Sequence, residues 1–468
     1  MQCGNERIAA YFDYSGWMTP SLQDASGFDG HADALHTPEN LAELEALLRD
    51  ASAGGVPVTV AGARTGVTGG AVPQGGWCVS LEKFRRLEIR AGLAIAGAGV
   101  SLMDVQQAAS RTGQFFPPDP TEMTASAGGA VNTNASGARS LRYGPIRNHV
   151  AALQATFVDG STRVFRQGES IDFPVPAIPL PACTKHSAGY SLRPGMDWIE
   201  LLTGSEGTLA VITEAELRLL PNPPALLTGV VFFPDDHLAV AAVAGWRSVP
   251  NVRMLEYFDR PSLDLLRSRH PGIPAAAVDA VLVEQEIASE DDPEAEAWLD
   301  RLEAAGALLE DSWFASAAAD RERFRRFRHA LPETVNDIVR RNGFQKMGSD
   351  FAVPVDRNEE MLAYYHLRLN ELFPGRYVIF GHIGDAHLHV NILPQSEDDV
   401  ARGQELMLDF ARKAVSLGGT VAAEHGVGKR KAHLLEVMYT PAQLEAMRDV
   451  KRRFDPQFLL GRGNLFPA

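Results

Sequence analysis

The sequence predicts an α+β protein of two or three domains, and three observations support this prediction. The chain has 468 residues, and a domain typically takes about 150. Hydrophobic residues make up 45% and charged residues 22% of the chain, which is ordinary for a globular protein with a large core. Amphipathic helical segments alternate with short strand-like segments along the chain. The first helical face is marked by Leu41, Leu44, Leu47 and Leu48, and a strand is expected over 56–60.

The boundaries of the N-terminal elements follow from capping and turn residues. Thr37 before Pro38 predicts the start of the first helix, and Gly54-Gly55 predicts its end. The prolines between 174 and 181 predict a loop between strands. Acidic helices begin after residues 221–224, so we expect the main domain boundary near residue 224. One such helix should open at Pro293 and close at Gly306.

The C-terminal half alternates helices and strands. The pattern predicts a helix over 356–373, a strand over 377–380 and a helix that ends at 418–419. A strand over 387–393 should place His387, His389 and Asn391 on one face. Thr440-Pro441 should open a last helix that ends near Phe454.

Charge and cysteine content exclude several classes of protein. The net charge of −15 argues against binding of nucleic acid, although a local pocket can still hold a small anion. Cys3, Cys78 and Cys183 form neither a disulfide framework nor a CxxC motif, which fits a reducing compartment. We find no signal peptide and no apolar run near 18 residues. We therefore expect a cytoplasmic protein, and peripheral contact with the inner membrane stays open.

Three segments concentrate glycine next to strands. In the first, residues 60–70, several backbone N–H groups can converge on a phosphate, although a plain turn-rich loop has the same composition. It matches neither GxGxxG nor the P-loop pattern. The second covers 116–120, 126–137 and 142–144, where small residues let the backbone approach a flat ligand. The third, residues 204–213, predicts a turn followed by a strand.

In this order and spacing, the three segments resemble the FAD-binding domain of the FAD-linked oxidase family, of the vanillyl-alcohol oxidase type. The most similar group contains D-lactate dehydrogenase, glycolate oxidase and D-2-hydroxyglutarate dehydrogenase. The matching runs are a glycine-rich pyrophosphate loop, FPPDP, GGxxxTNAxG, a Tyr-Gly pair and GSEGTL. The resemblance implies a two-subdomain FAD-binding domain at 1–224, with 440–468 packing back on it. An α/β substrate (cap) domain with an antiparallel sheet would occupy 225–439.

The resemblance also implies where FAD is bound. The residues that match the family's cofactor contacts are Gly62, Ala63, Arg64, Thr65, Gly66, Thr68, Gly69, Pro118, Asp119, Gly128, Gly129, Asn132, Asn134, Gly137, Tyr143, Gly144, Glu206, Gly207, Ile212 and Asn464. The family loop often has glycine where this chain has Ala63 and Arg64, and Arg64 would either add charge near the pyrophosphate or face solvent. Some relatives attach FAD through a histidine in this loop. No histidine lies between residues 60 and 70, so we expect non-covalent FAD.

Histidines and a glutamate form a second pattern in the C-terminal half. Two imidazoles and one carboxylate are provided by His382, His389 and Glu424, a donor set that suits Zn²⁺ best and also Mn²⁺ or Fe²⁺. The alternative is that these histidines only form hydrogen bonds, as lone histidines more often do. We expect both of their loops to follow strands. The spacing is not HExxH, so a metalloprotease helix is not indicated. The resemblance implies that these three residues bind the metal.

The resemblance assigns further roles around this metal. It makes His425 the catalytic base, Asn391 a substrate contact and Arg328 the group that holds the substrate carboxylate. The alternative for Arg328 is a solvated basic helix face, and Lys346 is a second candidate. His387 stands where the family usually has asparagine; it would be an extra ligand, a donor that orients a ligand or a determinant of substrate preference. Asp385 is expected to orient a histidine.

The function implied is oxidation of a D-2-hydroxy acid to the 2-oxo acid by hydride transfer to flavin. The class of substrate is D-lactate, glycolate or D-2-hydroxyglutarate. Electrons would then pass to a quinone, a cytochrome, an electron-transfer flavoprotein or oxygen. Two alternatives stay open, a non-catalytic flavoprotein subunit of an oxidase complex and a metal-dependent hydrolase. A homodimer is also left open.

Overall fold

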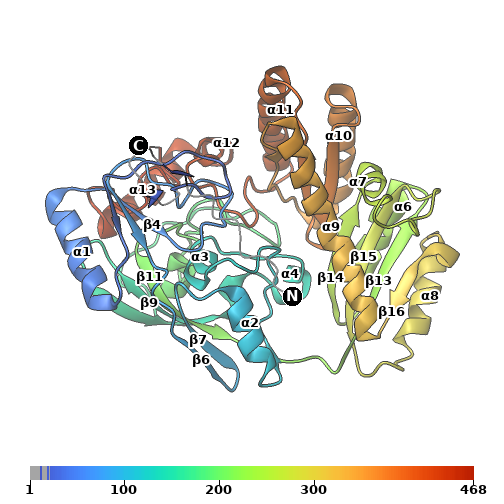
Figure 1. The fold of residues 1–468 in the computed structure, drawn as a ribbon, viewed down its shortest axis with the longest axis horizontal. Helices are drawn as coiled ribbons and strands as arrows, with labels where there is room; N and C mark the ends of the chain where they lie inside the picture. Colours follow the sequence, from blue (N-terminus) through green and yellow to red (C-terminus); the bar gives the residue numbers. More distant parts are fainter. Residues whose placement is uncertain (1–10, 13–17, 20–21, 468) are drawn as a thin grey trace.

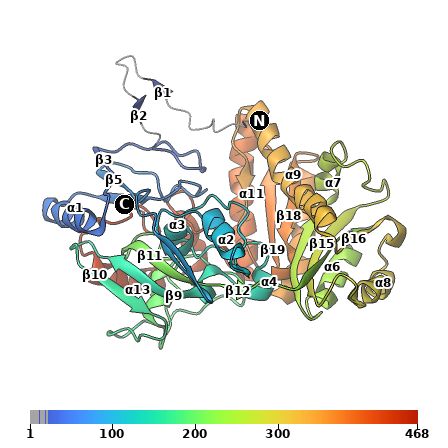
Figure 2. The same cartoon turned by 60° about the horizontal axis from the view of Figure 1, so that its bottom comes forward.

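The computed structural model describes residues 11–12, 18–19 and 22–467, and this part forms an α+β fold on two large sheets (Figure 1). The α+β prediction is therefore confirmed. The N-terminal half lies on one side of the molecule and a seven-stranded sheet on the other. Helix α4 (Ser140–Tyr143) lies between them in both views (Figure 2). Cys3 lies outside the described residues.

The N-terminal half holds a parallel and an antiparallel sheet. The parallel sheet has the order β3-β5-β4, with β3 at Ala34–His36, β4 at Val58–Ala61 and β5 at Trp77–Ser80. The antiparallel sheet has the order β10-β9-β11-β7-β6, with bounds Thr162–Arg166, Val150–Thr156, Val211–Arg218, Leu93–Gly97 and Leu87–Arg90. Two short pairs are β1 (Tyr11–Phe12) with β2 (Met18–Thr19) and β8 (Gln114–Phe115) with β12 (Leu220–Pro221). The connecting helices are α2 (Leu102–Ser110), α3 (Ala127–Asn132) and α5 (Trp198–Leu202).

The first helix, α1 (Leu41–Gly54), begins later than the sequence predicted. Thr37 does not cap it. The side chain of Asn40 accepts a hydrogen bond from the Glu43 N–H at 3.1 Å, so the chain enters the helix three residues further on. The end is as predicted, because Gly55 takes a left-handed conformation with φ of 63°. Leu44 and Leu48 are buried, which confirms the apolar face.

The predicted antiparallel sheet of the C-terminal half is present and has seven strands. Its order is β16-β13-β15-β14-β18-β19-β17, with bounds Trp313–Ala315, Ala225–Phe233, Asp279–Ile287, Val252–Phe258, Tyr377–His382, His387–Ile392 and Met347–Gly348. Helices α7 (Arg260–Leu266) and α9 (Ala318–Asn342) share an apolar cluster with one face of this sheet. The other face packs against α6 (Asp236–Trp246), α8 (Glu294–Ala304), α10 (Asn358–Leu372) and α11 (Glu397–Ser416).

The predicted C-terminal elements lie close to their expected positions, with one exception. Helix α13 spans Pro441–Phe454, and Thr440 caps it through a capping box with Gln443. The expected strand before Glu424 is wrong: between α11 and the 3-10 turn at Ala432–Leu434, Thr420 makes only an isolated bridge to Ala352. Beyond that bridge the segment makes separate hydrogen bonds and no ladder: the Ala423 N–H donates to the Asp350 carbonyl at 2.8 Å.

The C-terminal segment returns to the N-terminal half, beside α12 (Leu435–Met438) and α13 (Figure 1). The N–H of Val58 donates to the Leu459 carbonyl at 2.8 Å, and the N–H of Gly461 donates to the Val58 carbonyl at 2.9 Å. One apolar cluster includes Leu153 of β9 and Ile379 of β18, so the two large sheets share a core. Among the described helices, none is long and apolar enough to cross a bilayer.

Candidate active site

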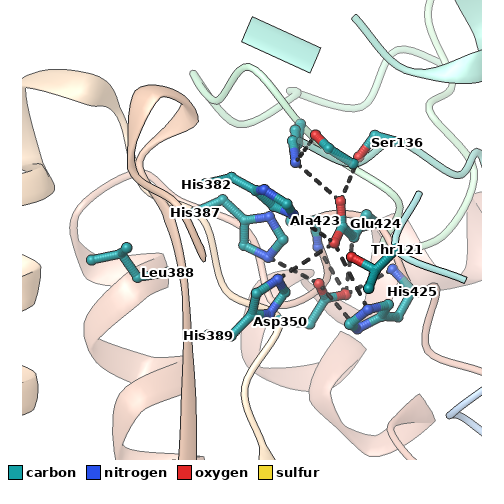
Figure 3. A network of polar contacts seen from close by, with 12 residues as sticks. Thr121, Ser136, Asp350, His382, His387, Leu388, His389, Ala423, Glu424 and His425 are labelled. Carbon is teal, nitrogen blue, oxygen red and sulfur yellow. Dashed lines mark hydrogen bonds and ion pairs between the residues drawn. The ribbon is translucent and has the colours of Figure 1, made fainter. Parts of the chain in front are cut away.

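Four histidines surround the carboxylate of Glu424 where the two halves of the molecule meet (Figure 3). Atom Oε1 of Glu424 lies 3.2 Å from Nε2 of His382 and 3.5 Å from Nε2 of His389. It lies 3.8 Å from Nε2 of His425. The fourth histidine, His387, lies beside His382 and His389. The structure therefore brings together the three predicted metal ligands and the predicted base.

The β18–β19 hairpin explains why these histidines converge. Its antiparallel register pairs His382 with His387 and Phe380 with His389. A single 3-10 turn joins the strands and ends at Ala386, which has a φ of 50°. Side chains alternate along β19, so Leu388 points away from the cluster (Figure 3). The two-residue period that the sequence indicated thus places His387 and His389 on the same face.

Glu424 is held from the N-terminal half. Its Oε2 atom accepts a hydrogen bond from the Ser136 hydroxyl at 2.7 Å and another from Lys185 Nζ at 3.0 Å. Oε1 is left facing the imidazoles. Burial alone would raise the pKa of Glu424, but Lys185 and His382 outweigh burial and lower it well below its usual value. Ser136 and Lys185 were not predicted site residues, although Ser136 lies in the GGxxxTNAxG run that carried the family resemblance.

The spacing of the donor atoms fits a divalent metal. Bonds of about 2.0–2.1 Å in a tetrahedral site place neighbouring donors roughly 3.4 Å apart. The distances of 3.2 and 3.5 Å from Glu424 match this spacing. The other ring nitrogen of each histidine faces an acceptor: His382 Nδ1 lies 2.5 Å from Glu256 Oε1, and His389 Nδ1 lies 3.3 Å from the Ser349 carbonyl. Metal-binding histidines are typically oriented in this way.

His425 is oriented by Asp350, a residue that the sequence did not indicate. The wholly buried Asp350 accepts through Oδ2 the N–H groups of Ala423, Glu424 and His425, at 3.2, 3.3 and 2.9 Å. Its Oδ1 atom lies 3.3 Å from His425 Nδ1. Burial lowers the pKa of His425, and Asp350 opposes that effect. The His425 side chain is 34% exposed, more than the others in the cluster, so a neutral and accessible imidazole results.

Arg328 lies at the cluster and not on a solvated helix face. Its Nε atom donates to Glu256 Oε2 at 2.9 Å, and its side chain is only 11% exposed. Glu256, also missed by the sequence, thereby joins Arg328 to His382. The expectation that Asp385 orients a histidine is wrong, because the β18–β19 turn directs this carboxylate toward Lys185, with the charged atoms 3.8 Å apart. Glu256 contacts His382 instead.

Asn391 and Lys346 lie further along the same sheet. Asn391 is buried in β19, and its amide donates to the His389 carbonyl at 3.4 Å. Lys346 immediately precedes β17, and no hydrogen bond or ion pair joins it to another described residue. Burial and the neighbouring Lys431 lower the pKa of Lys346. Lys346 is thus a cation without a neutralising partner in the described structure.

The first glycine-rich loop offers unpaired backbone donors. No backbone N–H group from residue 64 to residue 70 donates to another described residue. A Cβ atom at Gly62 would lie 2.2 Å from Ser126 Oγ, so a side chain there would displace the hydroxyl that caps α3. Such a row of free donors fits a pyrophosphate. Arg64 turns toward Cys78 on β5, with Nη2 3.6 Å from the sulfur.

The polar side chains predicted to contact FAD tie the glycine-rich segments together. Asn132 Oδ1 accepts the Gly207 N–H at 3.0 Å, and Asn134 donates to the His186 carbonyl at 3.2 Å. Asn464 donates to the carbonyls of Gly70 and Glu206 at 3.0 and 3.1 Å. These residues therefore fix the loops that would face the cofactor.

Three further residues that were predicted to contact FAD are held by hydrogen bonds or by burial in the core. Glu206 accepts the N–H groups of Val427 and Gly428 at 2.9 and 2.7 Å, which links the third segment to the Glu424 loop. The Tyr143 hydroxyl donates to Glu286 on β15. Ile212 is wholly buried in β11, so its side chain belongs to the core.

Two family models match the chain. "FAD binding domain" matches residues 32–166, and "FAD linked oxidases, C-terminal domain" matches residues 222–465. The molecule is thus an FAD-dependent oxidoreductase with an FAD-binding domain of the vanillyl-alcohol oxidase type. The chain belongs to the FAD-linked oxidase family.

Curated relatives and solved structures agree with this assignment. The chain is 33% identical to D-lactate dehydrogenase from Archaeoglobus fulgidus, over 92% of this chain and 90% of the relative. It is 29% identical to glycolate oxidase subunit GlcD from Bacillus subtilis, over 97% and 93%. It is 30% identical to D-2-hydroxyglutarate dehydrogenase from Xanthomonas citri pv. viticola, over 92% and 89%. A solved alkyldihydroxyacetonephosphate synthase has the same fold, with a TM-score of 0.68, 16% identity, and coverage of 91% of this chain and 75% of that one.

Proposed function

We propose that this protein oxidises a D-2-hydroxy acid to the 2-oxo acid, with a divalent metal at the Glu424 cluster. The observation that carries the proposal is the position of this cluster. Ser136, from the glycine-rich FAD-binding half, and His382, from the seven-stranded sheet, both lie against Glu424. The named activities of the relatives support the substrate class.

Each residue of the site has a separate role in the proposed reaction. Bound FAD supplies the two-electron acceptor for the hydride of substrate C2, and a bound divalent ion supplies a Lewis acid for the substrate hydroxyl. His382, His389 and Glu424 hold that ion, most naturally Zn²⁺. His425 accepts the hydroxyl proton at Nε2. Arg328 binds the substrate carboxylate through the part of its guanidinium that does not donate to Glu256. Asn391 and Lys346 also contact the substrate.

Residues 1–224 with 440–468 hold FAD, and 225–439 carry the metal and substrate. A quinone, a cytochrome, an electron-transfer flavoprotein or oxygen would accept the electrons. We place the protein in the cytoplasm, where peripheral membrane contact would bring it to a quinone.

Anaerobic reduction of the flavin tests the proposed function. D-Lactate, glycolate or D-2-hydroxyglutarate, mixed with the purified yellow protein without oxygen, is expected to bleach the flavin absorbance. The L-enantiomers of lactate and 2-hydroxyglutarate serve as controls and should leave it unchanged. A flavin that no D-2-hydroxy acid reduces would indicate a non-catalytic subunit. Hydrolytic activity that persists after the flavin has been removed would indicate a metal-dependent hydrolase.

The FAD is expected to be non-covalent, because the pyrophosphate loop contains no histidine that could attach it. Precipitation of the protein with acid should release all the yellow colour into the supernatant. Dialysis of the apoprotein against FAD should then restore the absorbance spectrum. Colour that stays in the pellet would contradict this expectation.

A further inference from the structure

His387 is the most deeply buried member of the histidine cluster. Its side chain has no exposed surface, and its ring centre lies 4.4 Å from that of His389 and 5.4 Å from that of His382. One ligand atom from each of His382, His387, His389 and Glu424 can be chosen so that all four lie within 4.8 Å of one another. The geometry thus places three imidazoles around a single point.

The two ring nitrogens of His387 have different surroundings. Nε2 faces the carboxylate of Asp350, with 3.0 Å between Nε2 and Oδ1, whereas no such contact is present at Nδ1, and both nitrogens are buried without a hydrogen-bond partner among the described residues. Buried polar atoms in native proteins are nearly always satisfied, so an unpaired one calls for an absent water or ion. The pairing of one nitrogen with a carboxylate is also the arrangement of His382, whose Nδ1 faces Glu256.

We propose that His387 is a third imidazole ligand of the metal, which makes the site three histidines and one glutamate. This inference rests on the proposed metal site and adds a ligand to the three that the resemblance implies. Nδ1 of His387 binds the ion, and Asp350 holds the opposite nitrogen. Asp350 therefore orients both a metal ligand and His425. A donor set rich in imidazole favours Zn²⁺ over Mn²⁺, which prefers oxygen donors.

Zinc affinity tests the proposal directly. The FAD-loaded protein is stripped of metal with a chelator, and Zn²⁺ binding is measured by competition with a chromophoric chelator. His387→Asn is expected to bind Zn²⁺ at least about 100-fold more weakly than the unmodified protein, because loss of even an outer-shell partner costs about 10- to 100-fold. FAD content should not change. His366→Asn, which removes a half-buried histidine of α10, is the matched control. Equal affinities of His387→Asn and the unmodified protein overturn the proposal.

A second measurement needs no variant, so it decides the matter if His387→Asn does not fold. X-ray absorption spectra of the Zn²⁺-loaded, unmodified protein should show three imidazoles in the metal shell. A count of two rejects His387 as a ligand and leaves the proposed function intact. If the unmodified protein binds no Zn²⁺ at all, both this inference and the metal in the proposed function are rejected.

Discussion

Replacing His425 with asparagine is expected to slow anaerobic flavin reduction by about 10²- to 10⁴-fold, the usual contribution of a general base. The reason is that His425 combines a lowered pKa with the most exposed side chain of the cluster, so a neutral imidazole is available to take the hydroxyl proton. Asp350 holds the opposite side of the ring. Stopped-flow absorbance with a D-2-hydroxy acid measures the rate, and the flavin content should stay the same.

A matched control separates this effect from general damage. His433 lies on the same C-terminal segment and is exposed, so His433→Asn should reduce its flavin at the unmodified rate. Reduction of His425→Asn at that same rate would reject His425 as the base. Slow reduction accompanied by lost FAD would point to a folding defect.

The fold could be predicted from the sequence where local signals were strong. Thr440 before α13 and Gly55 after α1 are caps whose effect depends on neighbouring residues only, and they marked the element ends well. Thr37 was a plausible cap as well, but Asn40 competes for the same role closer to the apolar face. The expected strand before Glu424 failed because strand formation needs a partner, and Ala352 offers only one bridge.

The candidate site, like the fold, could be predicted from the sequence only in part. Histidines on one strand face were visible as a two-residue period, and the hairpin brings them together as expected. The groups that hold the site were not visible, because each acts across a long sequence separation. Glu256 reaches His382, and Lys185 reaches Glu424. Such contacts depend on how the halves pack, and no local pattern encodes them.

Lys185 illustrates how much of the site depends on one of these contacts. Lys185→Met is expected to lower the free energy of unfolding of the metal-free protein by about 3–5 kcal/mol, since it leaves buried charge without its partner. The cation is wholly buried, 3.0 Å from Glu424 Oε2 and 3.8 Å from Asp385 Oδ2. Denaturant unfolding followed by tryptophan fluorescence, with a chelator present, measures the change.

Two further variants decide whether charge or packing causes the loss. Ser136→Ala removes one hydrogen bond to the same Glu424 oxygen but leaves the cation, so a smaller loss of about 1.5–3 kcal/mol is expected. Adding Glu424→Gln to Lys185→Met neutralises the nearer of the two carboxylates that the lysine faced, and much of the stability should return because a neutral amide is less costly to bury than a carboxylate. If the double variant is no more stable than Lys185→Met, the lysine stabilises the fold through packing, and Glu424 does not depend on it for its charge.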